Sequence, residues 1–222
     1  KLLFRFNDGK PIPYLIEKKP RFINKLSTYI FLGEFENKNV ILWDMSDSHE
    51  VLGNTDQVGS FSDGEKNYHP DLPKGTYFCD LRNLLPILNG KYANLYATAK
   101  GIFEWNRRVN FCQSCGGKLS SEKSGWEKAC KKCNFKTFPR IDPVVIMLIT
   151  KGNDILLGRS HGWPEKMYSC LAGFIEPGET IEAAAEREAM EESGIRIKNV
   201  KYITSQPWPF PASLMMGCTG EA

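Results

Sequence analysis

Four cysteines in two tight pairs place the strongest constraint on how this chain can fold. Cys112 and Cys115 form one C-x2-C pair, Cys130 and Cys133 form the second, and fourteen residues separate the pairs. This number and spacing of thiols is typical of a tetrahedral four-thiolate Zn²⁺ site. A redox dithiol needs one pair and leaves the second unexplained. Because four protein ligands leave no open position on the metal, we predict a structural zinc ribbon.

The remaining cysteines and the hydropathy bear on the compartment. Cys79, Cys170 and Cys218 are scattered singly, which favours a reducing compartment over a disulfide framework. We expect the cytoplasm or another reducing compartment; the chain opens at Lys1, so organellar targeting stays open. The longest strongly apolar run, 144–149, is far shorter than the roughly 20 residues of a membrane-spanning helix, so we expect no membrane partner.

Charge is balanced over the chain but concentrated around the cysteines. The 222 residues carry 29 Lys+Arg and 26 Asp+Glu, and 41% are hydrophobic, which excludes a disordered tail and a strongly basic DNA-coating protein. Between Cys112 and Arg140, however, seven basic side chains accompany two acidic ones. Such a ribbon could bind RNA or a polyphosphate, and a solvated lysine surface explains the same residues. The sequence leaves both interpretations open.

Hydrophobic patterns divide the chain into three parts. We expect a mixed α/β domain over 1–107, the zinc ribbon over 108–139 and a further domain over 140–222. Apolar runs at 28–35 and 39–45 predict a β-hairpin, and apolar residues at steps of three and four predict a packed helix over 91–107. The stretch 51–73, rich in Gly, Ser, Asp and Asn, predicts a long surface loop.

A second candidate site lies on a helix predicted over 181–193, after two strands at 144–150 and 155–158. On this helix Glu188, Glu191 and Glu192 lie within about 100° of one another, on the side of its apolar stripe. Three neighbouring carboxylates repel one another unless a cation lies among them, and hard oxygen ligands select Mg²⁺ or Mn²⁺. Such an ion can promote hydrolysis of a pyrophosphate. Arg187, on the flank, could orient a glutamate or hold a phosphate oxygen.

The segment 173–195 is similar to the Nudix box, GX5EX7REUXEEXGU, with Ala189 where a larger aliphatic residue is usual. The match includes every fixed position: Gly173, Glu179, Arg187, Glu188, Glu191, Glu192 and Gly194. This resemblance implies an α/β/α Nudix fold, within a mixed α+β chain, that acts on nucleoside diphosphates linked to another group. It makes Glu188, Glu191 and Glu192 the metal ligands and gives Glu192 a part in activating water.

The segment 205–211, SQPWPFP, resembles the array that marks the NADH pyrophosphatases within the Nudix superfamily. By this resemblance the substrate contacts are Gln206, Pro207, Trp208, Pro209, Phe210, Pro211 and Ser213. Taken alone, a Trp-Phe segment stiffened by prolines suits either a flat base or simple packing. Phe138 and Phe174 match aromatic residues that sandwich the nicotinamide in that family, one from each subunit, which implies a homodimer. Either phenylalanine could also belong to a core.

The resemblance implies a metal-dependent enzyme that splits NADH or NAD⁺ into nicotinamide mononucleotide and AMP and also removes NAD caps from RNA 5′ ends. Two alternatives are a Nudix hydrolase of ADP-ribose or dinucleoside polyphosphates, and an RNA-binding zinc-ribbon module with an inactive Nudix domain. From Arg140 onward the chain is shorter than a complete Nudix domain. We therefore expect the domain to be incomplete at its C-terminus, with a further metal-binding glutamate beyond Ala222.

Overall fold

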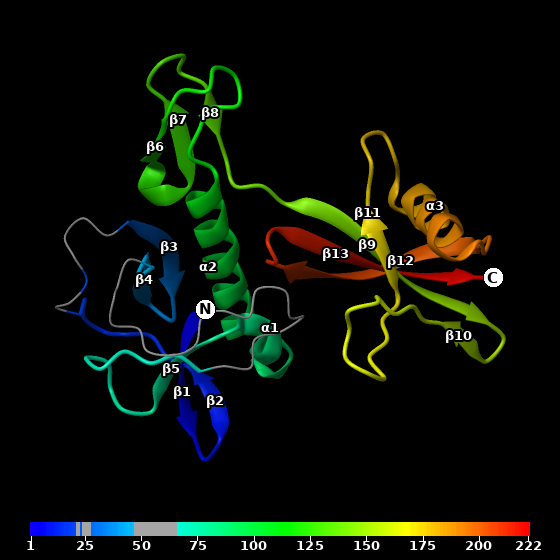
Figure 1. Cartoon of the computed structure of the whole chain (residues 1–222), viewed down its shortest axis with the longest axis horizontal. Helices are drawn as coiled ribbons and strands as arrows, with labels where there is room; N and C mark the ends of the chain where they lie inside the picture. Colours follow the sequence, from blue (N-terminus) through cyan, green and yellow to red (C-terminus); the bar gives the residue numbers. More distant parts are fainter. Residues whose placement is uncertain (21–22, 24–27, 47–65) are drawn as a thin grey trace. The chain divides into compact units, whose positions relative to one another are not determined.

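Figure 1 shows the fold in a computed structural model, which describes residues 1–20, 23, 28–46 and 66–222. The chain divides into two compact units, Lys1–Pro139 and Arg140–Ala222. The ribbon expected over 108–139 falls inside the first unit. Most of the surface loop predicted over 51–73 lies outside the described residues. The predicted mixture of helices and strands is confirmed.

The first unit contains a small antiparallel sheet and the predicted hairpin. In the sheet, β1 (Leu2–Asn7) lies between β2 (Lys10–Pro13) and β5 (Thr76–Cys79). The hairpin consists of β3 (Tyr29–Phe35) and β4 (Lys38–Trp43). Its two turn residues, Glu36 and Asn37, have φ angles of 49° and 59°. Positive φ at both positions gives the turn the twist that antiparallel strands require.

A long helix connects this region to the ribbon. After α1 (Leu81–Leu84) and the 3-10 turn η1 (Leu85–Ile87), α2 runs over Gly90–Arg108, one residue longer at each end than predicted. Asn89 caps it by accepting a hydrogen bond from the Tyr92 N–H. The predicted apolar stripe is confirmed as a packing face, because Tyr96, Ala99 and Ile102 are buried. The Tyr96 hydroxyl donates to the Leu3 carbonyl at 2.8 Å and so links α2 to β1.

The ribbon packs on the hairpin of the same unit. It comprises β6 (Leu119–Glu122), the 3-10 turn η2 (Lys123–Gly125), β7 (Glu127–Cys130) and β8 (Lys136–Thr137), paired in the order β6-β7-β8. A Cβ on Gly125, whose φ is +97°, would lie 2.8 Å from Ile30 of β3. The Trp126 Nε1 donates to the Phe31 carbonyl at 2.6 Å. The positive φ and the close approach of Ile30 require glycine at position 125.

The second unit is a mixed sheet with one helix against it. The sheet contains β10 (Asp154–Leu156), β9 (Asp142–Lys151), β13 (Ser213–Glu221) and β12 (Lys198–Trp208) in that order, and β11 (Leu171–Phe174) also pairs with β9. β13 runs parallel to β9, and the other pairs are antiparallel. The strand predicted over 155–158 ends at Leu156, and Gly158 forms a single bridge with Ser169.

The box helix α3 (Ile181–Ser193) has the predicted bounds. Thr180 caps its start by accepting from the Ala183 N–H, and Gly194 ends it with φ of 71°. Ala184, Ala185 and Ala189 are fully buried against the sheet, so small side chains let the helix approach closely. Within residues 140–222, all of which are described, α3 is the single helix, and the second helical layer of an α/β/α fold is not in this stretch.

Across the described residues, no helix combines the length and the apolar character that crossing a membrane requires.

Candidate functional site

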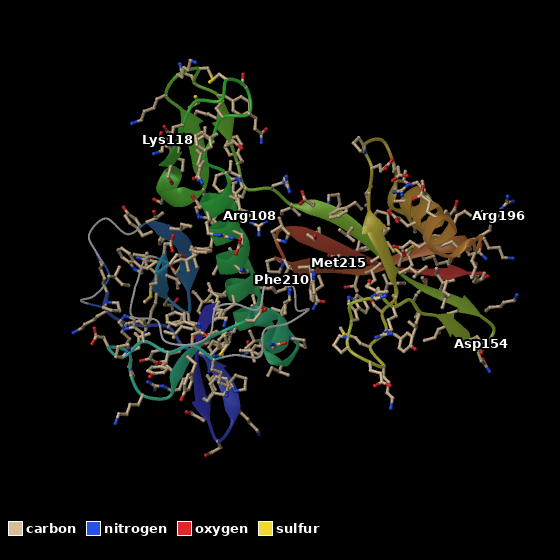
Figure 2. All side chains as sticks on the ribbon, in the orientation of Figure 1. Arg108, Lys118, Asp154, Arg196, Phe210 and Met215 are labelled. Carbon is tan, nitrogen blue, oxygen red and sulfur yellow. The ribbon has the colours of Figure 1, made fainter. Side chains whose placement is uncertain are left out.

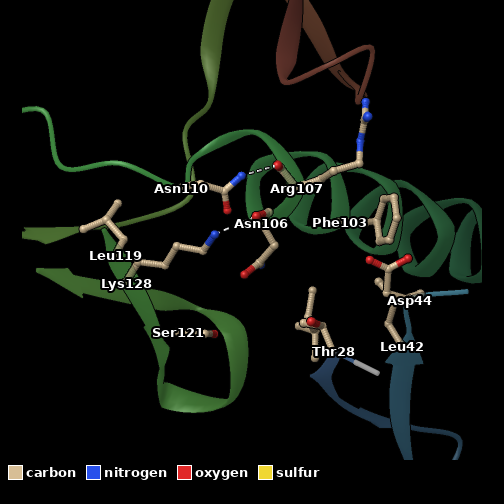
Figure 3. Close-up of a pocket in the computed structure, with 11 residues that line it drawn as sticks. Thr28, Leu42, Asp44, Phe103, Asn106, Arg107, Asn110, Leu119, Ser121 and Lys128 are labelled. Carbon is tan, nitrogen blue, oxygen red and sulfur yellow. Dashed lines mark hydrogen bonds between the residues drawn. The ribbon is translucent and has the colours of Figure 1, made fainter. Parts of the chain in front are cut away.

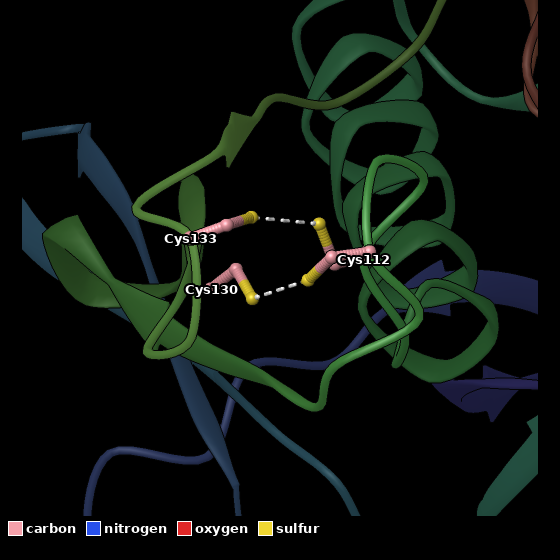
Figure 4. Close-up of side chains that lie close together, drawn as sticks. Cys112, Cys130 and Cys133 are labelled. Atoms are coloured by element: carbon pink, nitrogen blue, oxygen red, sulfur yellow. Dashed lines mark hydrogen bonds between the residues drawn. The ribbon is translucent and has the colours of Figure 1, made fainter.

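The four ribbon cysteines converge as the sequence predicts (Figure 4). Their sulfur atoms all lie within 4.8 Å of one another. The Sγ–Sγ distance is 3.6 Å between Cys112 and Cys133 and 3.5 Å between Cys115 and Cys130. A tetrahedron with Zn–S bonds of about 2.3 Å has edges of about 3.8 Å. The number, type and spacing of these donors therefore fit Zn²⁺.

The backbone around the cysteines favours a thiolate at Cys130, because the N–H groups of Cys133 and Lys132 donate to its sulfur and lower its pKa. The Phe135 N–H acts in the same direction on Cys133, but the neighbouring thiols outweigh it and raise the pKa of Cys133. A Cβ on Gly117 would lie 3.1 Å from the Cys130 sulfur and 3.3 Å from the Cys115 sulfur, so a larger residue would crowd the donors. The Gly117 carbonyl accepts from the Cys112 N–H at 2.7 Å, which closes the turn.

Lys128 joins the ribbon to the end of α2 (Figure 3). Its side chain is buried, and its Nζ donates to the carbonyls of Asn106 and Val109, both at 2.6 Å. The Asn106 Nδ2 in turn donates to the Gly125 carbonyl at 2.8 Å. Burial lowers the pKa of the Lys128 ammonium, while the last carbonyls of a helix favour a positive charge.

The surface charge of the ribbon is smaller than its sequence indicates. Lys128 counts toward the basic excess of the ribbon, but it lies in the interior and does not add to the surface charge. Lys136 is also neutralised, because it forms an ion pair with Glu127 at 2.5 Å. The sequence of β7, with Glu127 and Lys128 side by side, offers no signal for a buried lysine. A hollow of about 210 Å³ beside Lys128 involves none of the residues predicted to bind substrate.

Arg187 lies at the centre of the box carboxylates rather than on their flank. Its Nε and Nη2 donate to the two carboxylate oxygens of Glu179 at 2.6 and 2.8 Å. Its Nη1 donates to Glu188 at 2.9 Å and to Glu191 at 3.0 Å. Its Nη2 also donates to the Phe174 carbonyl at 2.9 Å. One guanidinium thus connects the box helix with β11 and with the loop that precedes the helix.

Glu179 is a site residue to which the sequence reasoning assigned no role. The bidentate hydrogen bonds from Arg187, together with the Glu176 N–H donated at 2.8 Å, lower the pKa of the Glu179 carboxyl to about 2. Its signal was its place among the fixed positions of the box. The sequence could not show that its partner would be an arginine eight residues away.

Glu188 and Glu192 share the side of α3 that faces β11. The Glu188 carboxylate lies directly over Gly173, where a Cβ would be 1.8 Å from its Cδ. Burial raises the pKa of Glu192, and the charge of Glu188 raises it further. A hydrogen bond from the Ala172 N–H to the Glu192 carboxylate acts in the opposite direction. Among the described residues, the ribbon cysteines alone bring three or more potential metal ligands within 4.8 Å. The glutamates share one face, but Arg187 draws Glu188 and Glu191 toward itself.

The predicted substrate residues are divided between the two compact units of the chain. Phe174, at the end of β11, is 59% exposed, and Phe138, after β8, is 58% exposed. Phe138 belongs to the first compact unit and Phe174 to the second. Neither phenylalanine is part of a hydrophobic core, so the packing interpretation is wrong for both.

The SQPWPFP segment forms the end of the β12–β13 hairpin. Gln206 lies opposite Met215, Pro207 opposite Leu214 and Trp208 opposite Ser213. The rings of Trp208 and Phe210 pack edge to face with centroids 5.0 Å apart. Figure 2 labels Phe210. Pro209 is buried and Pro211 half-buried, so the aromatic pair is held in place by its neighbours.

Comparison with protein families agrees with this geometry. Residues 140–216 match the model of the NUDIX domain. Residues 140–216 therefore form a NUDIX domain. Residues 6–105 match a second model, the NADH pyrophosphatase-like rudimentary NUDIX domain. The segment that contains the box and the mixed region before the ribbon therefore each match a domain of known type.

Two curated relatives of this chain share the description NAD-capped RNA hydrolase. NAD-capped RNA hydrolase NUDT12 of Homo sapiens is 44% identical over 145 residues, covering 61% of this chain and 31% of that protein. NAD-capped RNA hydrolase NudC of Mycobacterium bovis is 40% identical over 149 residues, covering 67% of this chain and 47% of that protein. The chain thus spans about a third to a half of these relatives. A NUDIX hydrolase structure from Nitrosomonas europaea has 24% identity and a TM-score of 0.44 over 51% of this chain and 67% of its own.

Proposed function

We propose that this chain carries the site of a metal-dependent NAD(H) pyrophosphatase. The enzyme would split NADH or NAD⁺ into nicotinamide mononucleotide and AMP, and it would remove NAD caps from RNA 5′ ends. The observation that carries the proposal is the pairing, in one chain, of an intact Nudix box with an NADH pyrophosphatase-like domain. The relatives named NAD-capped RNA hydrolases support the same reaction.

The carboxylates of α3 suit a hard divalent cation. Glu179, Glu188 and Glu191 surround one compensating cation, Arg187, and Glu192 lies close enough to Glu188 for that charge to raise its pKa. The four carboxylates therefore carry an excess of negative charge. We assign Glu188, Glu191 and Glu192 as the residues that would hold Mg²⁺ or Mn²⁺. When bound, such an ion neutralises charge on the phosphates and favours ionisation of water.

The protein's own groups position the reaction. Water forms a new bond to one phosphorus while the bridging P–O bond to the other phosphate breaks. Glu192 is the carboxylate that we assign to receiving the water proton, since it makes no ion pair among the described residues. Arg187 holds Glu188 and Glu191 in place and fixes the Phe174 carbonyl at the end of β11. The catalytic set is thus Glu188, Glu191, Glu192 and Arg187.

Aromatic side chains would hold the nicotinamide end of the substrate. We assign this contact to the exposed ring of Phe174 and to the SQPWPFP hairpin end, with Gln206 and Ser213 as polar partners. Phe138 of a second subunit would complete the sandwich, which makes the enzyme a homodimer. Zn²⁺ on the four cysteines would be structural, because the site has no open ligand position. None of the seven cysteines forms a disulfide in the structure, which suits a reducing compartment.

One experiment tests the reaction. Purified protein is incubated with NADH and Mg²⁺ or Mn²⁺, with ADP-ribose in parallel, and the products are separated by chromatography. We expect mononucleotide and AMP from NADH, and no products after chelation of the divalent ion. Preference for ADP-ribose would favour the alternative Nudix substrate class. Absence of turnover with both compounds, from a protein that binds RNA, would favour an inactive domain on an RNA-binding ribbon.

A further inference from the structure

The cysteine turns of the ribbon carry exposed lysines and an exposed aromatic ring. Phe111 and Lys118 form an antiparallel bridge, so their side chains emerge on the same side of the two segments. A Cβ on Gly117, next to Lys118, would lie 3.3 Å from the Cβ of Lys132. Lys131 is the neighbour of Lys132 in the turn between Cys130 and Cys133. We call Phe111, Lys118, Lys131 and Lys132 the ribbon patch.

The positive charge of the ribbon patch is not neutralised. Lys118, Lys131 and Lys132 are exposed, and none forms an ion pair with another described residue. Of the two ribbon carboxylates, Glu127 is buried and paired with Lys136, while Glu122 lies at the far end of β6, beside η2. The tight turns around the cysteines therefore carry three free ammonium groups. Figure 2 labels Lys118 on the ribbon.

The ring of Phe111 gives this patch a second property. Phe111 is 66% exposed, and it lies three residues after the end of α2, at the start of the cysteine turn. Folding gains little from an exposed phenylalanine, whereas a base stacked on its face gains about 1–3 kcal/mol. Lysines beside an aromatic ring match the alternation of phosphates and bases in a single strand. An acidic protein surface would use the charges and leave the ring without a role.

We infer that the ribbon patch binds the single-stranded RNA of a capped substrate, with Lys118, Lys131 and Lys132 on phosphates and Phe111 stacked on a base. This inference rests on the proposed function in one respect, namely that the bound RNA strand is part of the substrate. The patch belongs to the first compact unit and includes none of the residues assigned to hydrolysis, so we assign it affinity for the RNA body and none for a free dinucleotide. A capped RNA is thereby distinguished from NADH.

Binding of an uncapped RNA tests the patch apart from hydrolysis. A 3′-labelled 12-nucleotide single strand is titrated with protein, without divalent ions, between 50 and 200 mM KCl, and anisotropy gives the affinity. The triple variant Lys118→Gln, Lys131→Gln and Lys132→Gln removes three lysines from the patch. The fall of log K with log salt should become less steep by about 2, since each phosphate contact contributes about 0.7 to the magnitude of the slope. Affinity at 50 mM should fall at least tenfold. Phe111→Ala should weaken binding about fivefold and leave the slope unchanged.

A matched triple variant controls for net charge. Lys10→Gln with Lys74→Gln and Lys91→Gln removes the same charge from exposed positions outside the ribbon and should leave the slope near that of wild type. Equal effects of the two triple variants would overturn the inference. Displacement of RNA from the patch by polyglutamate as readily as by unlabelled RNA would also overturn it, in favour of an acidic protein partner. One equivalent of zinc in each variant confirms folding of the ribbon.

Turnover of free NADH separates this inference from the proposed function. The ribbon-patch variant should hydrolyse NADH at the wild-type rate, because it changes no residue of the box. NADH hydrolysis with RNA binding unaffected by the lysines would refute the inference alone. RNA binding that depends on the lysines, in a protein that hydrolyses nothing, would sustain the inference and refute the proposed function.

Discussion

Glu188 places its carboxylate in the space that a side chain at Gly173 would occupy. The atom that would collide with a Cβ is Cδ, at 1.8 Å, and both carboxylate oxygens would be within 2.2 Å. The contact joins β11 to α3, so a backbone feature of one element sets the position of a charged group on the other. A glycine on the strand is thereby part of the geometry of the box.

Gly173→Ala should separate activity from stability. The group in the way is the far end of a flexible side chain, so the carboxylate can swing aside while the backbone stays in place. We expect turnover of NADH to fall about a hundredfold, comparable to the loss of a positioned catalytic group, with little change in the unfolding temperature. Gly162→Ala, which has open space around its Cβ, serves as the control and should change neither quantity. Unfolding of the Gly173 variant would show that the contact is structural.

Glu179→Gln should weaken activity through Arg187. The change removes one charge from the bidentate pair and leaves the guanidinium free to bind Glu188 and Glu191 more tightly. We expect weaker activation by Mg²⁺, seen as a higher metal concentration at half-maximal turnover, with kcat at saturating metal less affected. Glu186→Gln, on an exposed position of the same helix, should leave the metal dependence unchanged. Equal metal curves for the two variants would contradict the role of Glu179.

Glu192→Gln tests the assignment of the water-activating carboxylate. The side chain is exposed on α3, so an isosteric amide should leave the fold intact. We expect kcat to fall at least a hundredfold, because general-base groups typically contribute factors of about 10² to 10⁴. Circular dichroism and the unfolding temperature should match those of wild type. A variant with wild-type turnover would remove Glu192 from the mechanism.

How far the sequence predicts the molecule depends on whether a contact is local. The box helix, its cap at Thr180 and its end at Gly194 follow from short-range patterns, and the structure has the same bounds. The cysteine cluster is equally local, because two turns suffice to place four sulfurs. The pairing of Arg187 with Glu179 and the contact of Glu188 with Gly173 depend on how α3 packs on β11, which periodicity does not reveal. The burial of Lys128 depends likewise on the ribbon meeting the end of α2.

Loss of zinc should destabilise the first compact unit and spare the second. The ribbon is joined to α2 by Lys128 and to β3 by Trp126, so its unfolding exposes both. We expect Cys115→Ser to abolish zinc binding and to accelerate amide exchange over 97–130, while exchange over 144–149 and 181–193 stays as in wild type. Cys170→Ser, outside the cluster, should keep one equivalent of zinc. Faster exchange in the second unit as well would show that its stability depends on the ribbon.

Glu104 is a buried carboxylate whose contribution to stability should depend on pH. It is 7% exposed and pairs with Lys100, Arg107 and Arg108 at 2.7, 3.1 and 3.0 Å. Burial opposes its ionisation, but the hydrogen bonds and charges of Lys100 and Arg107 outweigh that effect and lower the pKa to about 2. We expect Glu104→Gln to reduce the free energy of unfolding by about 2 kcal/mol at pH 7. The neutral amide no longer compensates the charges of Lys100, Arg107 and Arg108.

The sign of the pH dependence follows from the lowered pKa. The stabilisation by Glu104 is complete above the ordinary carboxyl pKa of 4.5 and is lost as pH falls toward about 2. The difference in unfolding free energy between wild type and Glu104→Gln should therefore be constant from pH 7 to about pH 5 and shrink below it. Glu17→Gln removes a solvent-exposed ion pair with Lys38 and should have no measurable effect at any pH. A difference that persists unchanged at pH 3 would mean that the amide disturbs packing, and that the charge of Glu104 contributes nothing.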